Sequence, residues 1–169
     1  MITERTSLRD YQRGLAARLA QQNSGQTVSR LGARAAGRDW LVDLADASEV
    51  IPVPRIAAVP LTQPWFAGVA NIRGNLYSVI DFSVFLGEAP GAGDSASRLL
   101  LVADKYRINC ALLVQAVLGL YREEELTRIE VASETPWVSA RYTDARGSQW
   151  QHLDMNRLVT HQDFLQVGL

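Results

Sequence analysis

The sequence predicts a mainly β protein built from two small barrels or sheets, with a helix at each end of the chain. Short apolar segments of strand length alternate with Gly- and Pro-containing turns from about residue 28 to residue 153. Residues 88–97 contain no large apolar side chain and separate these segments into two groups. Hydrophobic residues make up 47% of the 169 residues, which is enough for a buried core. Because each half has only about 60 to 70 residues, we expect the halves to share one core.

The first 26 residues predict an amphipathic helical extension. Its apolar residues recur at spacings of three and four, which places them on one helix face; they are Leu8, Tyr11, Leu15 and Leu19. One helix cannot bury its own apolar face, so this face is expected to pack either on the domain or on a partner. Residues 1–38 carry seven Arg against two acidic residues, and their scattered positions favour a solvated helix face over a binding face.

Residues 28–64 predict two strands followed by a loop. Small residues around Gly32 and Gly37 indicate thin strands joined by a turn. The alternation of apolar and polar residues over 40–45 is typical of a half-buried strand. Four prolines follow between residues 52 and 64. Because proline cannot donate to a strand ladder, this stretch is predicted to be edge strand and loop rather than helix.

The following residues predict a β-hairpin and one helical turn. Apolar strands over 68–73 and 76–82 flank the turn signal Gly74-Asn75. One turn of helix is expected over 83–86. The Gly, Pro and Ser residues of 88–97 then predict a mobile linker.

Residues 98–153 predict the second group of strands. Residues 108–121 form a long, almost wholly apolar segment in which Gly119 favours strand over helix, although periodicity alone leaves both open. Residues 138–142 and 150–153 predict a closing hairpin.

The expected division of the chain follows from these elements. It consists of an N-terminal helical extension (1–26) and one domain (27–169), which contains a first barrel mainly over 28–87, the linker 88–97, a second barrel mainly over 98–153 and a C-terminal helix over 154–166 that Asp154 caps.

The sequence predicts no catalytic site, no metal site and no cofactor. Cys110 is the only cysteine and lies in an apolar strand, which predicts an inert buried thiol. The soft metal ligands Cys110, His152 and His161 are far apart in sequence. Ser148, His152 and Asp154 have the residue types of a catalytic triad, but no nucleophile motif surrounds them. We therefore expect a protein that is not an enzyme.

The composition argues against several of the remaining classes of function. The net charge of −1 argues against a general nucleic-acid binder. The longest apolar runs fall short of the roughly 18 to 20 residues that a membrane span needs. The polar N-terminus lacks the apolar region of a secretory signal, and the single cysteine favours a reducing, cytoplasmic setting. Protein recognition is the favoured function, and a β-barrel that binds nucleic acid is the alternative.

Residues 62–82 carry a specific motif block. It runs from a Pro before two aromatic residues, through a Gly-Val pair and an Asn-Ile-Arg-Gly turn, to a strand that ends in Val-Ile-Asp-Phe. With Glu49-Val50 at the end of the preceding strand, this block closely resembles the CheW family, over roughly residues 28–165. The Arg-rich first helix and the form of the motifs are most similar to the CheW-like adaptors of type IV pilus (twitching) signalling. The sequence departs from the family pattern at Leu41, Ser78 and Gln115.

The resemblance implies two intertwined SH3-like barrels and a non-catalytic adaptor without a cofactor. Such adaptors link the CheW-like regulatory domain of a CheA-type histidine kinase to the cytoplasmic tip of methyl-accepting chemoreceptors. They act in the cytoplasm, where they join membrane-associated receptor arrays.

The resemblance also implies which residues contact partners; they are Ala47, Glu49, Gly68, Val69 and Arg73. Matching residues of the family lie close together, so an Arg73–Glu49 ion pair is expected; a pair that fixes the turn and direct contact with the receptor are both open. For Gly68, backbone geometry and a close approach by a partner are both open. Val69 is expected to lie in the core, whereas Ala47 could do so or contact a partner. The aromatic pair Trp65-Phe66 is expected to plug a barrel rather than to anchor a partner.

Overall fold

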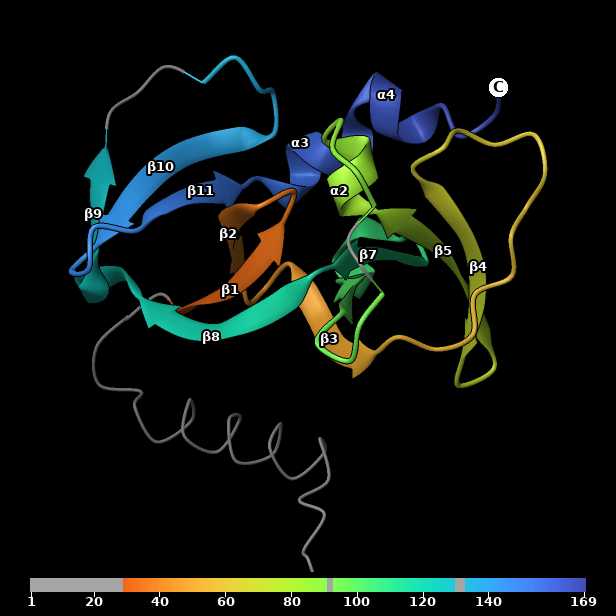
Figure 1. Ribbon diagram of the computed structural model, residues 1–169, viewed down its shortest axis with the longest axis horizontal. Helices are drawn as coiled ribbons and strands as arrows, with labels where there is room; N and C mark the ends of the chain where they lie inside the picture. Colours follow the sequence, from red (N-terminus) through yellow and green to blue (C-terminus); the bar gives the residue numbers. More distant parts are fainter. Residues whose placement is uncertain (1–28, 91–92, 130–132) are drawn as a thin grey trace, which may run out of the picture.

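Two mixed β-sheets lie side by side in the computed structural model, which describes residues 29–90, 93–129 and 133–169 (Figure 1). The six-stranded sheet has the order β8-β1-β2-β11-β10-β9; its strands are β1 (Ser29–Ala35), β2 (Arg38–Asp43), β8 (Ala116–Arg122), β9 (Leu126–Ile129), β10 (Val138–Asp144) and β11 (Gln149–Leu153). The five-stranded sheet has the order β3-β6-β7-β5-β4; its strands are β3 (Ala47–Pro52), β4 (Phe66–Ile72), β5 (Asn75–Asp81), β6 (Arg98–Val102) and β7 (Cys110–Val114). The predicted mainly β class is confirmed.

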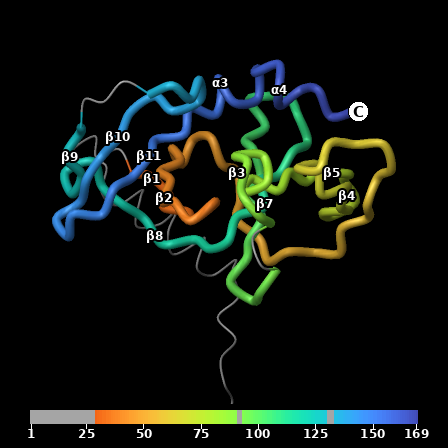
Figure 2. The backbone as a smooth tube through the Cα atoms, turned by 45° about the horizontal axis from the view of Figure 1, so that its top comes forward, coloured from red at the N-terminus to blue at the C-terminus, as the bar shows by residue number. Residues whose placement is uncertain are grey.

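Short helices join these strands; they are α2 (Phe82–Phe85), the 3-10 turns η1 (Asp104–Tyr106) and η2 (Glu123–Glu125), α3 (Met155–Thr160) and α4 (Gln162–Leu165). α2, α3 and α4 lie where the two sheets meet (Figures 1 and 2). Asp154 caps α3 as expected, because its side chain accepts a hydrogen bond from the Arg157 N–H. The predicted C-terminal helix is nevertheless interrupted, since His161 has extended backbone and separates α3 from α4. The predicted N-terminal helix, with Leu8, Tyr11, Leu15 and Leu19, lies outside the described residues.

The strands are not shared between the sheets as the sequence suggested. The expected barrels were 28–87 and 98–153, but the six-stranded sheet combines the first two strands with the last four. The five-stranded sheet takes the middle of the chain, from β3 to β7. The two halves of the sequence are therefore intertwined, as the family resemblance implies, because β11 near the end of the chain pairs in parallel with β2 near its start.

The apolar segment over 108–121, for which strand was favoured over helix, does form strands. It contains two of them and passes from β7 in one sheet to β8 in the other. The change occurs at Gln115, whose backbone N–H donates to the Arg34 carbonyl at 2.8 Å. The sequence pattern does not reveal this change of sheet, because the strands on both sides of Gln115 are apolar.

The predicted half-buried strand over 40–45 ends at Asp43, and its residues 40–42 are buried on both faces. Trp40 and Val42 belong to a core shared by the two sheets, whereas Leu41 packs inside the curved six-stranded sheet. Leu41 is fully buried, because the sheet curls around its own inner face.

Three apolar clusters hold the fold. The largest, which we call the shared core, unites both sheets and the helices; its buried members include Leu31, Trp40, Val42, Ile80, Phe82, Leu100, Leu112, Leu153, Met155, Leu158 and Phe164. A second cluster lies within the five-stranded sheet and a third within the six-stranded sheet. The expectation that the halves share one core is confirmed.

Candidate functional site

The hairpin between β4 and β5 presents Arg73 at its tip. Ile72 pairs with Asn75, so the turn has two central residues. Both adopt positive φ, 53° at Arg73 and 85° at Gly74, as tight hairpin turns of this length require. The Asn71 side chain accepts a hydrogen bond from the Gly74 N–H at 2.9 Å and fixes the turn.

Arg73 forms a two-pronged ion pair with Glu49. The Arg73 Nη1 atom lies 2.6 Å from Glu49 Oε2, and Nη2 contacts the other carboxylate oxygen. The predicted ion pair is therefore present. β3 and β4 are the two edge strands of the five-stranded sheet, so the pair joins its edges. The Glu49 side chain is 15% exposed and the Arg73 side chain 58% exposed, which leaves the guanidinium on the surface. The hydrogen bonds that Arg73 donates to the Glu49 carboxylate raise the pKa of Arg73.

A second contact between the two edges of the five-stranded sheet passes over Gly68. The loop residue Ala57 forms two backbone hydrogen bonds with Val69, at 2.8 and 2.9 Å. Gly68 has φ +139°, and a Cβ atom there would lie 2.1 Å from the Ala57 carbonyl oxygen. Both the backbone geometry and a close approach therefore require glycine. The close approach comes from the chain's own loop, and Gly68 is buried beneath it.

The other residues implied by the resemblance divide into two groups. Trp65 and Phe66 pack against the shared core, and Trp65 contacts the rings of Phe85 and Phe164 at centroid distances of 5.3 and 6.3 Å. This is the plug-like packing that the sequence favoured over an exposed anchor. Ala47 also packs against the shared core.

Val69 and Leu76 lie on the surface side of the hairpin. Among the described residues, Val69 is half-buried and belongs to none of the three core clusters, contrary to its expected core position. Leu76, opposite Asn71 and three residues after Arg73, is 61% exposed. Leu76 was predicted only as a strand residue. Its position next to the turn is the signal that could have identified it as an exposed side chain. Arg73, Glu49, Val69 and Leu76 form what we call the hairpin surface.

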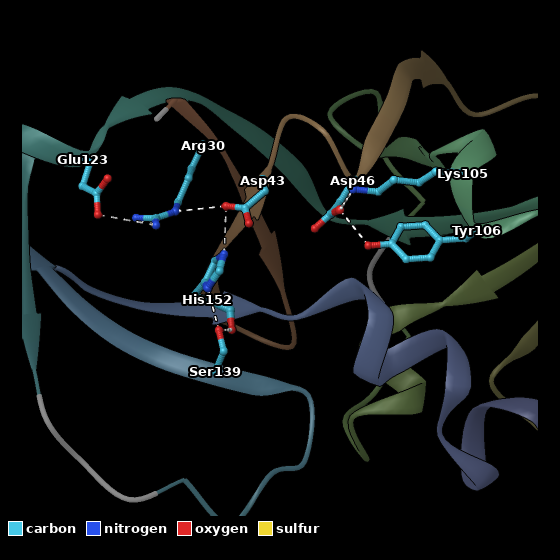
Figure 3. Close-up of polar contacts among 8 residues, drawn as sticks. All are labelled: Arg30, Asp43, Asp46, Lys105, Tyr106, Glu123, Ser139 and His152. Atoms are coloured by element: carbon cyan, nitrogen blue, oxygen red, sulfur yellow. Dashed lines mark hydrogen bonds and ion pairs between the residues drawn. The ribbon is translucent and has the colours of Figure 1, made fainter. Parts of the chain in front are cut away.

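A polar cluster lies in the six-stranded sheet (Figure 3). Asp43 Oδ1 accepts hydrogen bonds from Arg30 Nε at 3.1 Å and from His152 Nε2 at 2.9 Å. His152 Nδ1 is 2.6 Å from the Ser139 hydroxyl, which donates to it when the imidazole proton is on Nε2. Hydrogen bonding to His152, together with Arg30, holds the pKa of Asp43 below its usual range. Glu123 lies 3.9 Å from Arg30 at the rim.

This cluster differs from the residue triple considered in the sequence. Ser148 donates its backbone N–H to Asp144, and Asp154 caps α3, so neither contacts His152. The observed Ser139, His152 and Asp43 instead link β10, β11 and β2. Their hydrogen bonds brace the sheet across three strands.

A second cluster ties the connection between β2 and β3 to η1 (Figure 3). The Tyr106 hydroxyl donates to Asp46 Oδ1 at 2.7 Å, and Lys105 Nζ lies 2.6 Å from the same oxygen. Burial, with the hydrogen bond to Asp46, raises the pKa of Tyr106 well above its usual value. The crossover from one sheet to the other is thereby anchored.

Cys110 and the acidic and imidazole groups offer little for metal or redox chemistry in the described part of the chain. Burial raises the pKa of the Cys110 thiol to about 12, which keeps it protonated and unreactive. Within residues 29–90, 93–129 and 133–169, no group of three His, Cys, Asp or Glu side chains is placed to hold a metal ion. Over the same residues, no helix has the length and apolar character to cross a membrane.

Comparisons with known proteins agree with this architecture. A family model described as a CheW-like domain matches residues 30–163. The chain is 31% identical over 164 residues to Protein PilI of Pseudomonas aeruginosa, covering 93% of this chain and 90% of PilI. The crystal structure of the scaffolding protein TtCheW from Thermoanaerobacter tengcongensis matches with a TM-score of 0.66 and 19% identity, covering 78% of this chain and 87% of TtCheW.

Proposed function

The chain belongs to the CheW-like family, and on this premise we propose that it is a non-catalytic adaptor that couples chemoreceptors to a CheA-type histidine kinase. Its similarity to PilI supports a pathway that controls twitching by type IV pili, in the cytoplasm at membrane-associated receptor arrays.

The observation that carries the proposal is the hairpin surface. A tight turn and a two-pronged ion pair hold Arg73 in a fixed position beside the exposed Leu76. Arginine is enriched among the residues that contribute most at protein interfaces, and the buried centre of an interface is more apolar than its polar rim. We propose that this surface contacts the CheW-like regulatory domain of the kinase.

The test compares two leucines of nearly equal exposure. Leu76 on the hairpin is 61% exposed, and Leu165 on α4 is 62% exposed. Leu76→Asp is expected to weaken binding to the kinase regulatory domain from the same genome by about tenfold or more. Leu165→Asp introduces the same charge elsewhere and is expected to leave the affinity unchanged. Isothermal titration calorimetry measures both, and equal affinities would contradict the proposed surface.

A charge exchange separates the two roles of Arg73. Arg73→Glu is expected to abolish kinase binding. The double variant Arg73→Glu with Glu49→Arg restores an ion pair between the sheet edges. If Arg73 contacts the kinase directly, the double variant stays defective; recovery of full affinity would assign Arg73 a purely internal role. In cells, a deletion strain carrying Leu76→Asp is expected to lose twitching zones that the wild-type gene restores.

A further inference from the structure

A cavity of about 420 Å³ lies in the six-stranded sheet, on the other sheet from the hairpin surface. Its polar lining includes three arginines from three strands, Arg34 of β1, Arg38 of β2 and Arg141 of β10. Two glutamines of β11, Gln149 and Gln151, add amide groups.

The acidic groups at this cavity leave its charge positive. Arg34 forms a two-pronged pair with Asp39, at 2.9 Å from Nε and 3.3 Å from Nη2. The lining thus holds three cations and one anion. Glu88 approaches Arg38 at 3.4 Å, but both side chains are about half exposed, so water weakens this contact.

Arg141 is the strongest indication of a ligand. Its Nε atom is buried, and it has no hydrogen-bond partner within the described part of the chain. A buried charged donor without an acceptor is costly, so such groups are rare in native structures, and a bound ion is one of the explanations for them. Arg141 lines the cavity, which is the place from which that acceptor would come.

We propose that this cavity binds a phosphate monoester. One guanidinium group satisfies a planar carboxylate, whereas a phosphate offers three terminal oxygens that several guanidinium groups can share. Arg38 and Arg141 lie on the same face of the sheet, so two guanidinium groups can share one phosphate, as in the second case. The volume falls in the range of small-molecule sites and leaves room for the organic group attached to the phosphate.

The test uses phenyl phosphate as the probe, with benzoate and phenol as its carboxylate and neutral counterparts. Calorimetry with the full chain is expected to show one saturable site for phenyl phosphate, with affinity that falls as salt concentration rises. Benzoate is expected to bind at least about tenfold more weakly, and phenol not at all. Glu88→Gln is expected to raise the affinity for phenyl phosphate, because the Glu88 carboxylate then no longer competes with the phosphate for Arg38.

Two variants of neighbouring strands provide the matched comparison. Arg141→Gln removes the guanidinium group whose Nε atom is unpaired, whereas Arg128→Gln removes an exposed arginine of β9 that does not line the cavity. We expect about a tenfold loss of affinity for Arg141→Gln and none for Arg128→Gln. Arg38→Gln, at a half-exposed position, is expected to weaken binding without affecting the melting temperature.

Three outcomes would overturn the proposal. They are the absence of a saturable site, equal losses in Arg141→Gln and Arg128→Gln, and benzoate binding as tight as that of phenyl phosphate. None of these outcomes bears on kinase binding by the hairpin surface, so the two proposals stand or fall separately.

Discussion

The Asp43 carboxylate connects side chains that are far apart in the sequence. It accepts hydrogen bonds from Arg30, 13 residues earlier, and from His152, 109 residues later. The Arg30 side chain is only 9% exposed, and it also lies over the Tyr142 ring at 4.9 Å. Sequence reasoning had no means of finding this cluster, because no local motif connects its members. It found the Arg73–Glu49 pair only because the family resemblance brought the two residues together.

Asp43→Asn is expected to reduce the free energy of unfolding at neutral pH by about 1–3 kcal/mol, since it leaves the buried Arg30 with a weaker partner. The pKa of Asp43 is lowered in the fold. Its stabilising effect is therefore fully present above the ordinary carboxyl pKa of about 4 and is lost as the pH falls through the lower folded value. Urea denaturation from neutral pH to about pH 3 should show the wild-type advantage shrinking in acid.

Asp104→Asn serves as the control for this titration, because Asp104 is exposed. Its unfolding free energy should follow that of the wild type at every pH. A difference between wild type and Asp43→Asn that stayed constant down to acid pH would exclude an electrostatic origin.

Among the elements, individual strands were easier to predict than their partners. The hairpin of β4 and β5, the turn at α2 and the closing hairpin of β10 and β11 carry local turn signals. The passage from β7 to β8 carries none, because a continuous apolar run suits two apolar strands in different sheets as well as one. The short strand β9 was missed for a related reason, since its four residues mix apolar and polar side chains.

Closure of the five-stranded sheet depends on one glycine. Gly68→Ala would force a Cβ atom against the Ala57 carbonyl at a backbone conformation that side chains rarely adopt. We expect a loss of about 2–4 kcal/mol in the free energy of unfolding and faster amide exchange at Val69. Gly87→Ala is the control: Gly87 has φ +86° but open space around its Cβ position. It should cost about 1 kcal/mol. Equal losses in the two variants would show that backbone conformation alone, not the approach of Ala57, demands glycine at residue 68.

The whole molecule is expected to unfold as one unit, because the shared core draws on both sheets. Leu112 of β7 is fully buried in that core. Leu112→Ala should lower the free energy of unfolding by about 2–5 kcal/mol while keeping a single transition. Hydrogen exchange should accelerate together in β4–β5 and in β10–β11. A calorimetric scan with two separate transitions, or exchange that changed in only one sheet, would contradict a common core.

The intertwined order of the strands has a consequence for how the protein is made. β1 and β2 leave the ribosome first, yet their neighbours β8 and β11 come from residues 116–122 and 149–153. The five-stranded sheet has all its strands once residue 114 has emerged. The nascent hairpin of β1 and β2 therefore lacks its β8 neighbour until residue 122 has emerged, and its β11 neighbour until residue 153 has emerged. During that interval the hairpin is the segment that chaperones would be expected to shield.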